Sequence, residues 1–399
     1  MDKTHKIVLR IQYVFVCLFF GSLNFEMFSP FMEDLSISKM TAFLYIIGTF
    51  MSPLNSVLNV TRIRGVLVAV FLMFGFMVIS SILNGCYKIF DFSLFLNIIM
   101  FWLLLNHYRR DPRIFNDGLL WFALSASLVG LLFIFGIGVS FDEQSGRFSI
   151  FDDNENGVGI KMALGILFIV NYTLNYTRNA PLHKPWLLVL TIPMIVLLFA
   201  TASRTAVIVL ALGIILFVIF RPTSSRWLRF LWLVIGAIVI YYGIVLISEQ
   251  ELLMARFVLT AEEGSLSQRD SIWLMYWKLI QENIFLGVGF TGGEGIAKRV
   301  FGEVRSPHNV FVEVALYSGI LGFIPFLCFV YFLYRNAFMY LRHEKNLCPI
   351  MMSIGLAGML LGGQALNVKL FWTMAAFAIS YQVSHNMSRK ISVKPVNAV

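Results

Sequence analysis

Residues 65–86 read GVLVAVFLMFGFMVISSILNGC, a stretch of mainly apolar side chains without a charged residue. A helix needs about 20 such residues to cross the ~30 Å hydrocarbon layer of a membrane, so this stretch predicts a transmembrane helix. Eleven further segments of this kind lie near residues 11–30, 37–57, 92–107, 118–139, 157–176, 185–201, 204–220, 228–248, 310–334, 348–366 and 369–385. The sequence therefore predicts an all-α, polytopic membrane bundle of about twelve transmembrane helices.

The overall composition agrees with this fold class. Hydrophobic residues make up 58% of the 399-residue chain and charged residues 13%, and the mean hydropathy is +0.79. A soluble domain is about 45–50% apolar and about 25% charged, and a single soluble core stops growing beyond ~250–300 residues. The apolar surplus must therefore face lipid, which excludes soluble, disordered and collagen-like proteins. We expect one integral membrane domain over residues 1–399.

Basic residues are concentrated on one side of the predicted helices. If the N-terminus is cytoplasmic, the inner segments hold 19 of the 31 Lys and Arg residues and four of the 22 Asp and Glu residues. Cytoplasmic loops of membrane proteins are the basic ones, so twelve spans with both termini in the cytoplasm fit better than eleven. The formal net charge of +9 then reflects orientation in the lipid bilayer, and we expect no nucleic-acid partner.

Two connections on the predicted outer face are longer than the others, residues 140–156 and residues 249–309. The longer one contains Trp273, Tyr276 and Trp277 at the spacing of one helix face. We expect short helices in this large periplasmic loop. Their aromatic face would lie on the membrane interface or pack on the loop's own domain.

One histidine and three arginines stand out on this outer face. His308 directly precedes the span near 310–334, where an imidazole could exchange a proton near neutral pH. Arg204 stands between two apolar runs, and arginine at membrane depth tends to mark a functional site. With Arg147 and Arg269 it would supply guanidinium forks that suit a doubly anionic diphosphate. The plainer alternatives are a structural histidine and arginines that lie at the surface.

The acidic residues of the first outer loop allow a second interpretation. Asp152, Asp153 and Glu155 could hold a hard cation, but their clustering in one loop is more simply a negative surface. The outer His, Asp and Glu residues also lack the spacing of a zinc site. We therefore expect neither a metal nor another cofactor.

These features form an ordered series. It runs through Arg147, Asp152-Asp153-Asn154-Glu155-Asn156-Gly157, Ser203-Arg204, Arg269, Ile272-Trp273, Gly287-Val288-Gly289, His308-Asn309, and Gly319 to Gly322. The series resembles the bacterial O-antigen ligase and O-antigen polymerase family, membrane glycosyltransferases of the type C class, over roughly residues 145–330. The chain departs from the family at Asp153, where proline is frequent.

The resemblance implies transfer of a glycan from an undecaprenyl-diphosphate carrier at the periplasmic face of the bacterial inner membrane. The transfer would need no metal or nucleotide sugar and would invert the anomeric carbon. By the same resemblance Arg204 and Arg269 would bind the leaving diphosphate, and His308 would orient or deprotonate the acceptor hydroxyl. Further substrate contacts would come from Arg147, Asn154, Asn309, Trp273 and Trp277.

Two reactions within the family share these residues. A polymerase passes the growing chain onto another lipid-linked repeat unit, whereas a ligase passes it onto lipid A–core. The acidic loop resembles the polymerase pattern more, so polymerisation is the first expectation, with a chain-length regulator as a candidate partner. Outside the family, the alternative is a flippase or another lipid-linked oligosaccharide transporter. That class predicts ionisable mid-helix residues and Gly- or Pro-broken spans, and few of either occur.

Overall fold

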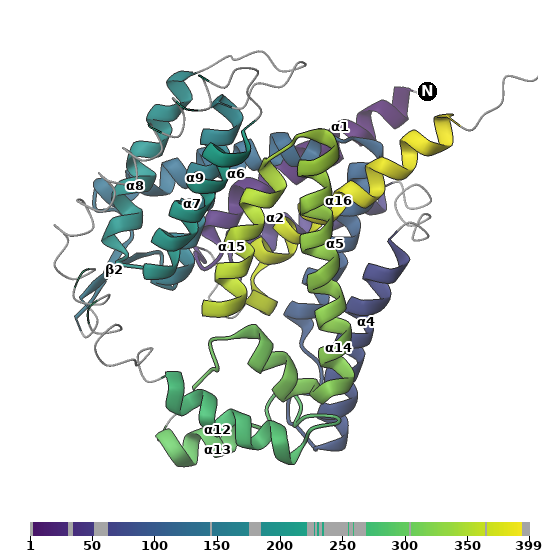
Figure 1. Cartoon of the computed structure of the whole chain (residues 1–399), viewed down its shortest axis with the longest axis vertical. Helices are drawn as coiled ribbons and strands as arrows, with labels where there is room; N and C mark the ends of the chain where they lie inside the picture. Colours follow the sequence, from purple (N-terminus) through teal and green to yellow (C-terminus); the bar gives the residue numbers. More distant parts are fainter. Residues whose placement is uncertain are drawn as a thin grey trace, which may run out of the picture. The chain divides into compact units, whose positions relative to one another are not determined.

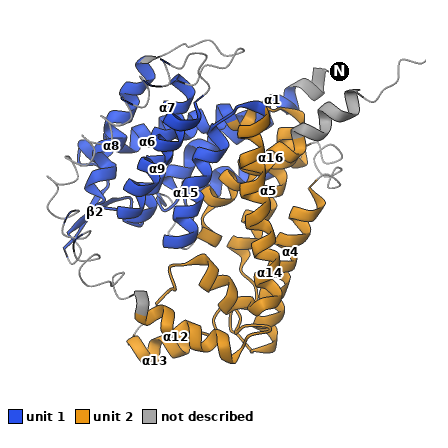
Figure 2. Cartoon of the chain, in the orientation of Figure 1, with its two compact units in different colours: residues 1–48, 116–267, 344–363 blue, residues 49–115, 268–343, 364–399 orange. Residues whose placement is uncertain are grey.

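The computed structural model describes residues 3–30, 35–51, 63–143, 146–174, 185–221, 269–302, 305–363 and 365–392, and the single positions 227, 230, 234, 254 and 258. This part of the chain is mainly helical, with one two-stranded antiparallel sheet (Figure 1). The chain divides into two compact units (Figure 2). Unit 1 comprises residues 1–48, 116–267 and 344–363, and unit 2 comprises residues 49–115, 268–343 and 364–399.

Unit 1 is built around α7. Its elements are α1 (Lys3–Ser22), the 3₁₀ turn η1 (Leu23–Phe25), α2 (Ile37–Phe50), α6 (Ile114–Ile134), β1 (Val139–Asp142), β2 (Arg147–Ile150), α7 (Glu155–Leu174), the 3₁₀ helix η3 (Pro185–Leu190), α8 (Thr191–Ala200), α9 (Arg204–Phe220) and α15 (Cys348–Gly362). Helix α7 packs against α8, α9 and α15. Residues 158–169 within it are all buried, which makes α7 the core helix of the unit.

Unit 2 is built around α14. Its elements are α4 (Arg64–Leu83), α5 (Phe92–Arg110), α12 (Arg269–Glu282), α13 (Glu294–Phe301), α14 (Val310–Met339), the π-helical turn η4 (Tyr340–Glu344), the 3₁₀ turn η5 (Ala365–Asn367) and α16 (Lys369–Ser392). Helix α14 packs against α4, α12 and α16, and α16 also packs against α5.

Helix α14 is interrupted at Gly319, whose φ of 57° and ψ of −160° are not helical. The segment between α12 and α13 crosses this break. The N–H of Leu321 donates to the Phe285 carbonyl, and the N–H of Val288 donates to the Leu316 carbonyl. A Cβ atom on Gly319 would lie 2.4 Å from the carbonyl carbon of Phe285, so the crossing requires glycine at this position.

Eleven of the predicted spans overlap described helices, and the span near residues 228–248 lies outside the described residues apart from 230 and 234. Five of the described helices are long and apolar enough to cross a membrane: Ile7–Phe25, Arg64–Leu83, Ile114–Ile134, Glu155–Leu174 and Val310–Glu344. The apolar helices Ile37–Phe50, Trp186–Ala200, Arg204–Phe220 and Cys348–Gly362 are shorter. The fold is that of a helical, multi-pass membrane protein. The number of twelve spans, the single membrane domain and the orientation of the termini stay predictions.

Candidate functional site

The predicted outer loop near residues 140–156 contains a β-hairpin that carries Arg147. Strands β1 and β2 pair antiparallel, with Asp142 opposite Arg147. Arg147 and Ser149 are buried, whereas Phe148 between them is 38% exposed, as expected for side chains that alternate between the two faces of a strand. The sequence predicted only a loop here. The hairpin fixes the direction in which the Arg147 side chain points.

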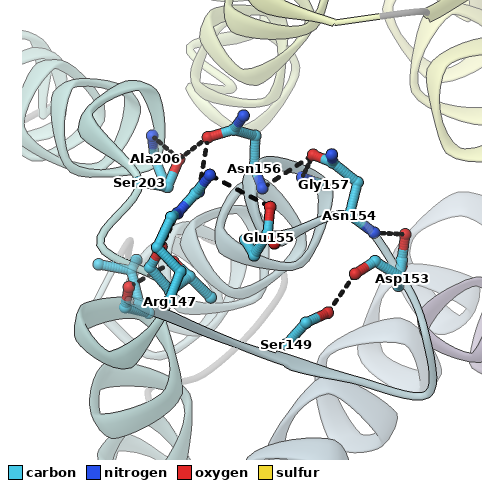
Figure 3. A network of polar contacts seen from close by, with 11 residues as sticks. Arg147, Ser149, Asp153, Asn154, Glu155, Asn156, Gly157, Ser203 and Ala206 are labelled. Carbon is cyan, nitrogen blue, oxygen red and sulfur yellow. Dashed lines mark hydrogen bonds and ion pairs between the residues drawn. The ribbon is translucent and has the colours of Figure 1, made fainter. Parts of the chain in front are cut away.

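The Arg147 guanidinium connects three segments of unit 1 (Figure 3). Its Nε donates to the Thr201 carbonyl at 2.8 Å, and its Nη2 donates to Asn156 Oδ1 at 2.9 Å. Its Nη1 lies 3.1 Å from Glu155 Oε2, and the Arg147 side chain is 6% exposed. A planar guanidinium with five N–H donors suits such a junction. Arg147 thereby ties the hairpin to the start of α7 and to the turn between α8 and α9.

That turn presents Arg204, the first residue of α9. Ala202 has a φ of 44°, which is uncommon for a residue with a side chain. Ser203 Oγ accepts the N–H of Ala206 at 3.4 Å and so caps α9. The same hydroxyl donates to Asn156 Oδ1 at 3.0 Å. The backbone from which the half-buried Arg204 side chain extends is therefore held by the start of α7.

Asn154, a predicted substrate contact, caps α7. Its Oδ1 accepts the N–H groups of Asn156 and Gly157, at 3.0 and 3.4 Å, and the residue is exposed. Helix α7 approaches the turn between α8 and α9 at Gly159. A Cβ atom there would lie 3.0 Å from the Cβ atom of Ser203, so a larger residue would separate α7 from the cap of α9.

Two of the acidic residues of this loop form ion pairs. Glu155 pairs with Arg147, and Asp153 Oδ2 lies 2.6 Å from Lys161 Nζ. The Glu155 and Asp153 side chains are 17% and 14% exposed, so at these two positions the expected negative surface is replaced by mostly buried pairs. No group of three or more His, Cys, Asp or Glu residues placed to hold a metal ion occurs within the described residues.

In unit 2, the half-buried His308 lies in the turn directly before α14. Its φ of 49° is in the left-handed region, and its N–H donates to Ser306 Oγ at 3.3 Å. Asn309 is the N-cap of α14, because its Oδ1 accepts the N–H groups of Phe311 and Val312 at 2.9 and 3.4 Å. The turn and the cap together fix the backbone at the base of the imidazole.

Helix α12 holds the same turn through two aromatic side chains. Trp273 Nε1 donates to the Pro307 carbonyl at 2.7 Å, and Tyr276 Oη donates to the Arg305 carbonyl. Burial, followed by the nearby carboxylate of Glu294, raises the pKa of Tyr276 to about 12. The Tyr276 hydroxyl therefore keeps its proton, and remains a donor, at all physiological pH values.

The aromatic face predicted for this helix packs largely within unit 2. Tyr276 belongs to a buried cluster whose other members are Ile272, Leu279, Ile280, Val288, Ala297 and Leu316. Trp277 is 56% exposed instead. Of the two expectations for this face, packing on its own domain is confirmed for Tyr276.

Gly287 and Gly319 of the sequence series meet at the break in α14. Gly287 has a φ of 69°, and a Cβ atom on it would lie 2.4 Å from the Leu316 carbonyl oxygen. Asn84 Nδ2 donates to the Gly287 carbonyl at 3.2 Å, and the N–H of Phe290 donates to Ser81 Oγ at 2.9 Å. The segment between α12 and α13 is thus fixed to both α4 and α14. This arrangement keeps α12 against the His308 turn.

The predicted site residues fall into two groups, one in each unit. Unit 1 contains Arg147, Asn154 and Arg204, and unit 2 contains Arg269, Trp273, Trp277, His308 and Asn309. Arg147 shares one network with the turn that bears Arg204, and Trp273 bonds to the turn that bears His308. Arg269 is the first residue of α12, and its side chain lies outside the described part of the structure.

Sequence reasoning missed several polar partners in unit 1. Asn156 and Ser203 were quoted only as part of the series, and Thr201 contributes a main-chain carbonyl that no side-chain pattern reveals. Lys161 was not among the predicted site residues, and it lies within the fully buried part of α7. A lysine inside an apolar helix is the signal that could have identified it.

Residues 189–327 match the family model described as O-antigen ligase. This segment includes the turn that bears Arg204, all of α12 and α13, and the His308 turn with the first part of α14. Arg147 and its hairpin precede it. No curated protein matches the chain. The series from Arg204 to His308 therefore falls within one recognised domain.

Proposed function

Because residues 189–327 match the O-antigen ligase family model, we propose that the chain is a member of the O-antigen ligase and polymerase family and that it polymerises oligosaccharide repeat units carried on undecaprenyl diphosphate. The reaction takes place at the periplasmic face of the bacterial inner membrane, with both termini of the chain in the cytoplasm. The observation that carries the proposal is the placement of Arg204 and His308. Each lies within or directly before the first turn of a helix, on a backbone held by several hydrogen bonds, inside the matched domain.

The proposed reaction is a single displacement. The acceptor hydroxyl oxygen attacks the anomeric carbon of the donor sugar, and the bond from that carbon to the diphosphate oxygen breaks with inversion. The hydroxyl proton passes to the imidazole of His308. The electron pair leaves with undecaprenyl diphosphate, whose growing negative charge is met by the guanidinium groups of Arg204 and Arg269. The N-terminal end of α9 adds its positive partial charge beside Arg204.

The remaining predicted contacts have supporting roles. Asn309 and Asn154 cap α14 and α7, so they act on the substrate only if their amide nitrogens also reach the glycan. Trp277 is exposed and offers a surface on which a sugar can stack. Arg147 is held by Thr201, Asn156 and Glu155. These contacts support a role in holding the Arg204 turn, and a direct bond from Arg147 to the diphosphate stays a prediction.

Ligation onto lipid A–core is the second candidate reaction. The matched family is described as O-antigen ligase, which favours it, whereas the acidic loop before α7 resembles the polymerase pattern and favours polymerisation. Both reactions use the same donor and the same leaving group. They differ only in the acceptor, so the acceptor decides between them. A chain-length regulator as partner stays a prediction.

The test uses the purified full-length protein in lipid nanodiscs with a lipid-linked repeat unit, in the presence and absence of lipid A–core. Polymerisation predicts a ladder of products from the repeat unit alone. Product that appears only when lipid A–core is added would assign the ligase reaction. Transbilayer movement of the lipid-linked glycan in proteoliposomes, without new glycosidic bonds in either reaction, would assign a flippase and refute the proposal.

A further inference from the structure

Helix α7 carries a buried lysine in its second turn. Lys161 Nζ lies 2.6 Å from Asp153 Oδ2 and 3.8 Å from Glu26 Oε2, and the Lys161 side chain is 4% exposed. An ionised lysine at such depth is costly unless carboxylates face it. Because the ammonium group is enclosed between these two carboxylates, Lys161 is not placed to touch a substrate. Any effect on the reaction has to pass through its partners.

Asp153 is the central residue of the loop between β2 and α7. Its backbone carbonyl accepts a hydrogen bond from Ser149 Oγ of the hairpin. The two preceding residues, Phe151 and Asp152, have φ values of 56° and 57°, a conformation that costs free energy for residues with a side chain. The ion pair from Asp153 to α7 therefore stabilises a turn that the local sequence disfavours.

This loop is continuous with the network that holds the Arg204 turn (Figure 3). Asn154 follows Asp153, and its Oδ1 accepts the N–H of Asn156 at 3.0 Å. Asn156 Oδ1 accepts from Arg147 Nη2 and from Ser203 Oγ, at 2.9 and 3.0 Å. Ser203 is the cap from which Arg204 begins α9. A displaced loop would move Asn156 and loosen the cap beside Arg204.

We propose that Lys161 is a positioning residue. By binding Asp153 it holds the loop before α7, and through Asn156 and Ser203 it sets the position from which Arg204 reaches the diphosphate. The inference rests on the proposed function, because Lys161 acts only through Arg204. It assigns Lys161 an effect on turnover and none on the affinity for the acceptor glycan.

The test compares kinetic constants of full-length variants in nanodiscs with the lipid-linked repeat unit. Lys161→Met should lower kcat about a hundredfold with little change in the acceptor KM, because a displacement of about 1 Å near the reacting atoms costs that much. Asp153→Asn should also lower kcat. The double variant should be no slower than Lys161→Met alone, because Lys161→Met already removes the contact with Asp153 that Asp153→Asn weakens, and effects within one contact do not add.

A matched control comes from an ion pair outside the network that holds the Arg204 turn. Lys88 Nζ lies 2.7 Å from Asp91 Oδ2, with the two side chains 46% and 6% exposed. When Lys88 is removed, Asp91 still accepts hydrogen bonds from the N–H of Leu94 and from Asn367 Nδ2. Lys88→Met should leave kcat unchanged. Hydrogen exchange of the backbone over residues 147–157 provides a readout that is independent of transfer, and it should become faster in Lys161→Met and stay the same in Lys88→Met.

Unchanged exchange and unchanged kcat in Lys161→Met would overturn the positioning role, as would losses that multiply in the double variant. If Lys161→Met does not insert into the membrane, Asp153→Asn carries the same test through a less buried side chain. A wild-type protein that forms no product, or an Arg204→Ala variant with full activity, would instead refute the proposed function. In that case the exchange measurement still shows whether Lys161 holds the loop.

Discussion

The turns that present Arg204 and His308 are held by different kinds of contact. In unit 1, charged and amide groups hold the Arg204 turn, through Arg147 and the Asn156 side chain. In unit 2, neutral donors hold the His308 turn, because an indole and a phenol each bond to a main-chain carbonyl.

This difference follows the charge that each turn is proposed to handle. Near Arg204, the buried cations Arg147 and Lys161 each pair with a carboxylate, so they hold the loop and the turn without an uncompensated buried charge. An imidazole that exchanges a proton needs supports that do not titrate in the same range, and neither an indole nor Tyr276, with a pKa of about 12, does so. We therefore expect substitutions that remove a charge to disturb the Arg204 turn. Substitutions that remove a hydrogen-bond donor should disturb the His308 turn.

The largest effect is expected from His308→Ala. Without the imidazole the acceptor hydroxyl has no positioned base, and such groups contribute about 10²–10⁴-fold to rate. Chain transfer by purified protein should fall by that order while membrane insertion and thermal stability stay normal. His385→Ala, on the predicted cytoplasmic side, is the control. Normal glycan length in His308→Ala would remove this histidine from the mechanism.

Arg204→Lys should produce a smaller but clear loss. The ammonium keeps the charge but cannot make two parallel hydrogen bonds to a phosphate, so we expect kcat to fall about tenfold to a hundredfold. Arg299→Lys, an exposed residue of α13, should behave as wild type. Full activity of Arg204→Lys would indicate an anchoring role at the membrane surface.

Trp273→Phe tests the support of the His308 turn. Loss of the indole donor leaves the Pro307 carbonyl without its partner, which costs about 1–3 kcal/mol and should lower kcat several-fold. Leu274→Ala is the matched control, because Leu274 lies on the same helix and is exposed. A raised acceptor KM in Trp273→Phe, with kcat unchanged, would assign Trp273 to glycan binding instead.

The smallest effect is expected from Tyr276→Phe, and its pH dependence has a defined sign. The folded pKa of about 12 lies above the ordinary value of ~10, so the contribution of Tyr276 to stability is complete below pH ~10 and declines above it. Thermal unfolding should show Tyr276→Phe less stable by about 1 kcal/mol at pH 8. The difference should narrow above pH ~10. A constant difference at every pH would show that the hydroxyl is not buried as described.

Much of the fold was predictable because transmembrane helices are specified locally. A stretch such as residues 65–86 cannot remain in water, and a helix satisfies its backbone within the segment itself; α4 begins and ends within a few residues of the prediction. The hairpin formed by β1 and β2 was not predictable, because its strands have only four residues each. Their pairing depends on the helices against which β2 packs, α7 and α8.

The candidate site, like the fold, was predictable only in part. The identities and order of Arg147, Arg204 and His308 could be read from the sequence, and residues 189–327 match the expected family. The interpretation of Asp153 and Glu155 as a negative surface was wrong in the folded protein, where both pair with cations. Neighbouring residues in a loop give no sign of whether they face solvent or a helix.

Local hydrophobicity, then, decides which segments of this chain enter the membrane, because the transfer of about 20 apolar residues into lipid is favourable whatever the rest of the chain does. Tertiary structure decides which charges are paired. Arg147 meets Thr201 across 54 positions of sequence, and Trp273 meets Pro307 across 34. Electrostatic and hydrogen-bond energies depend on distances of a few ångströms, and only the packed helices set those distances.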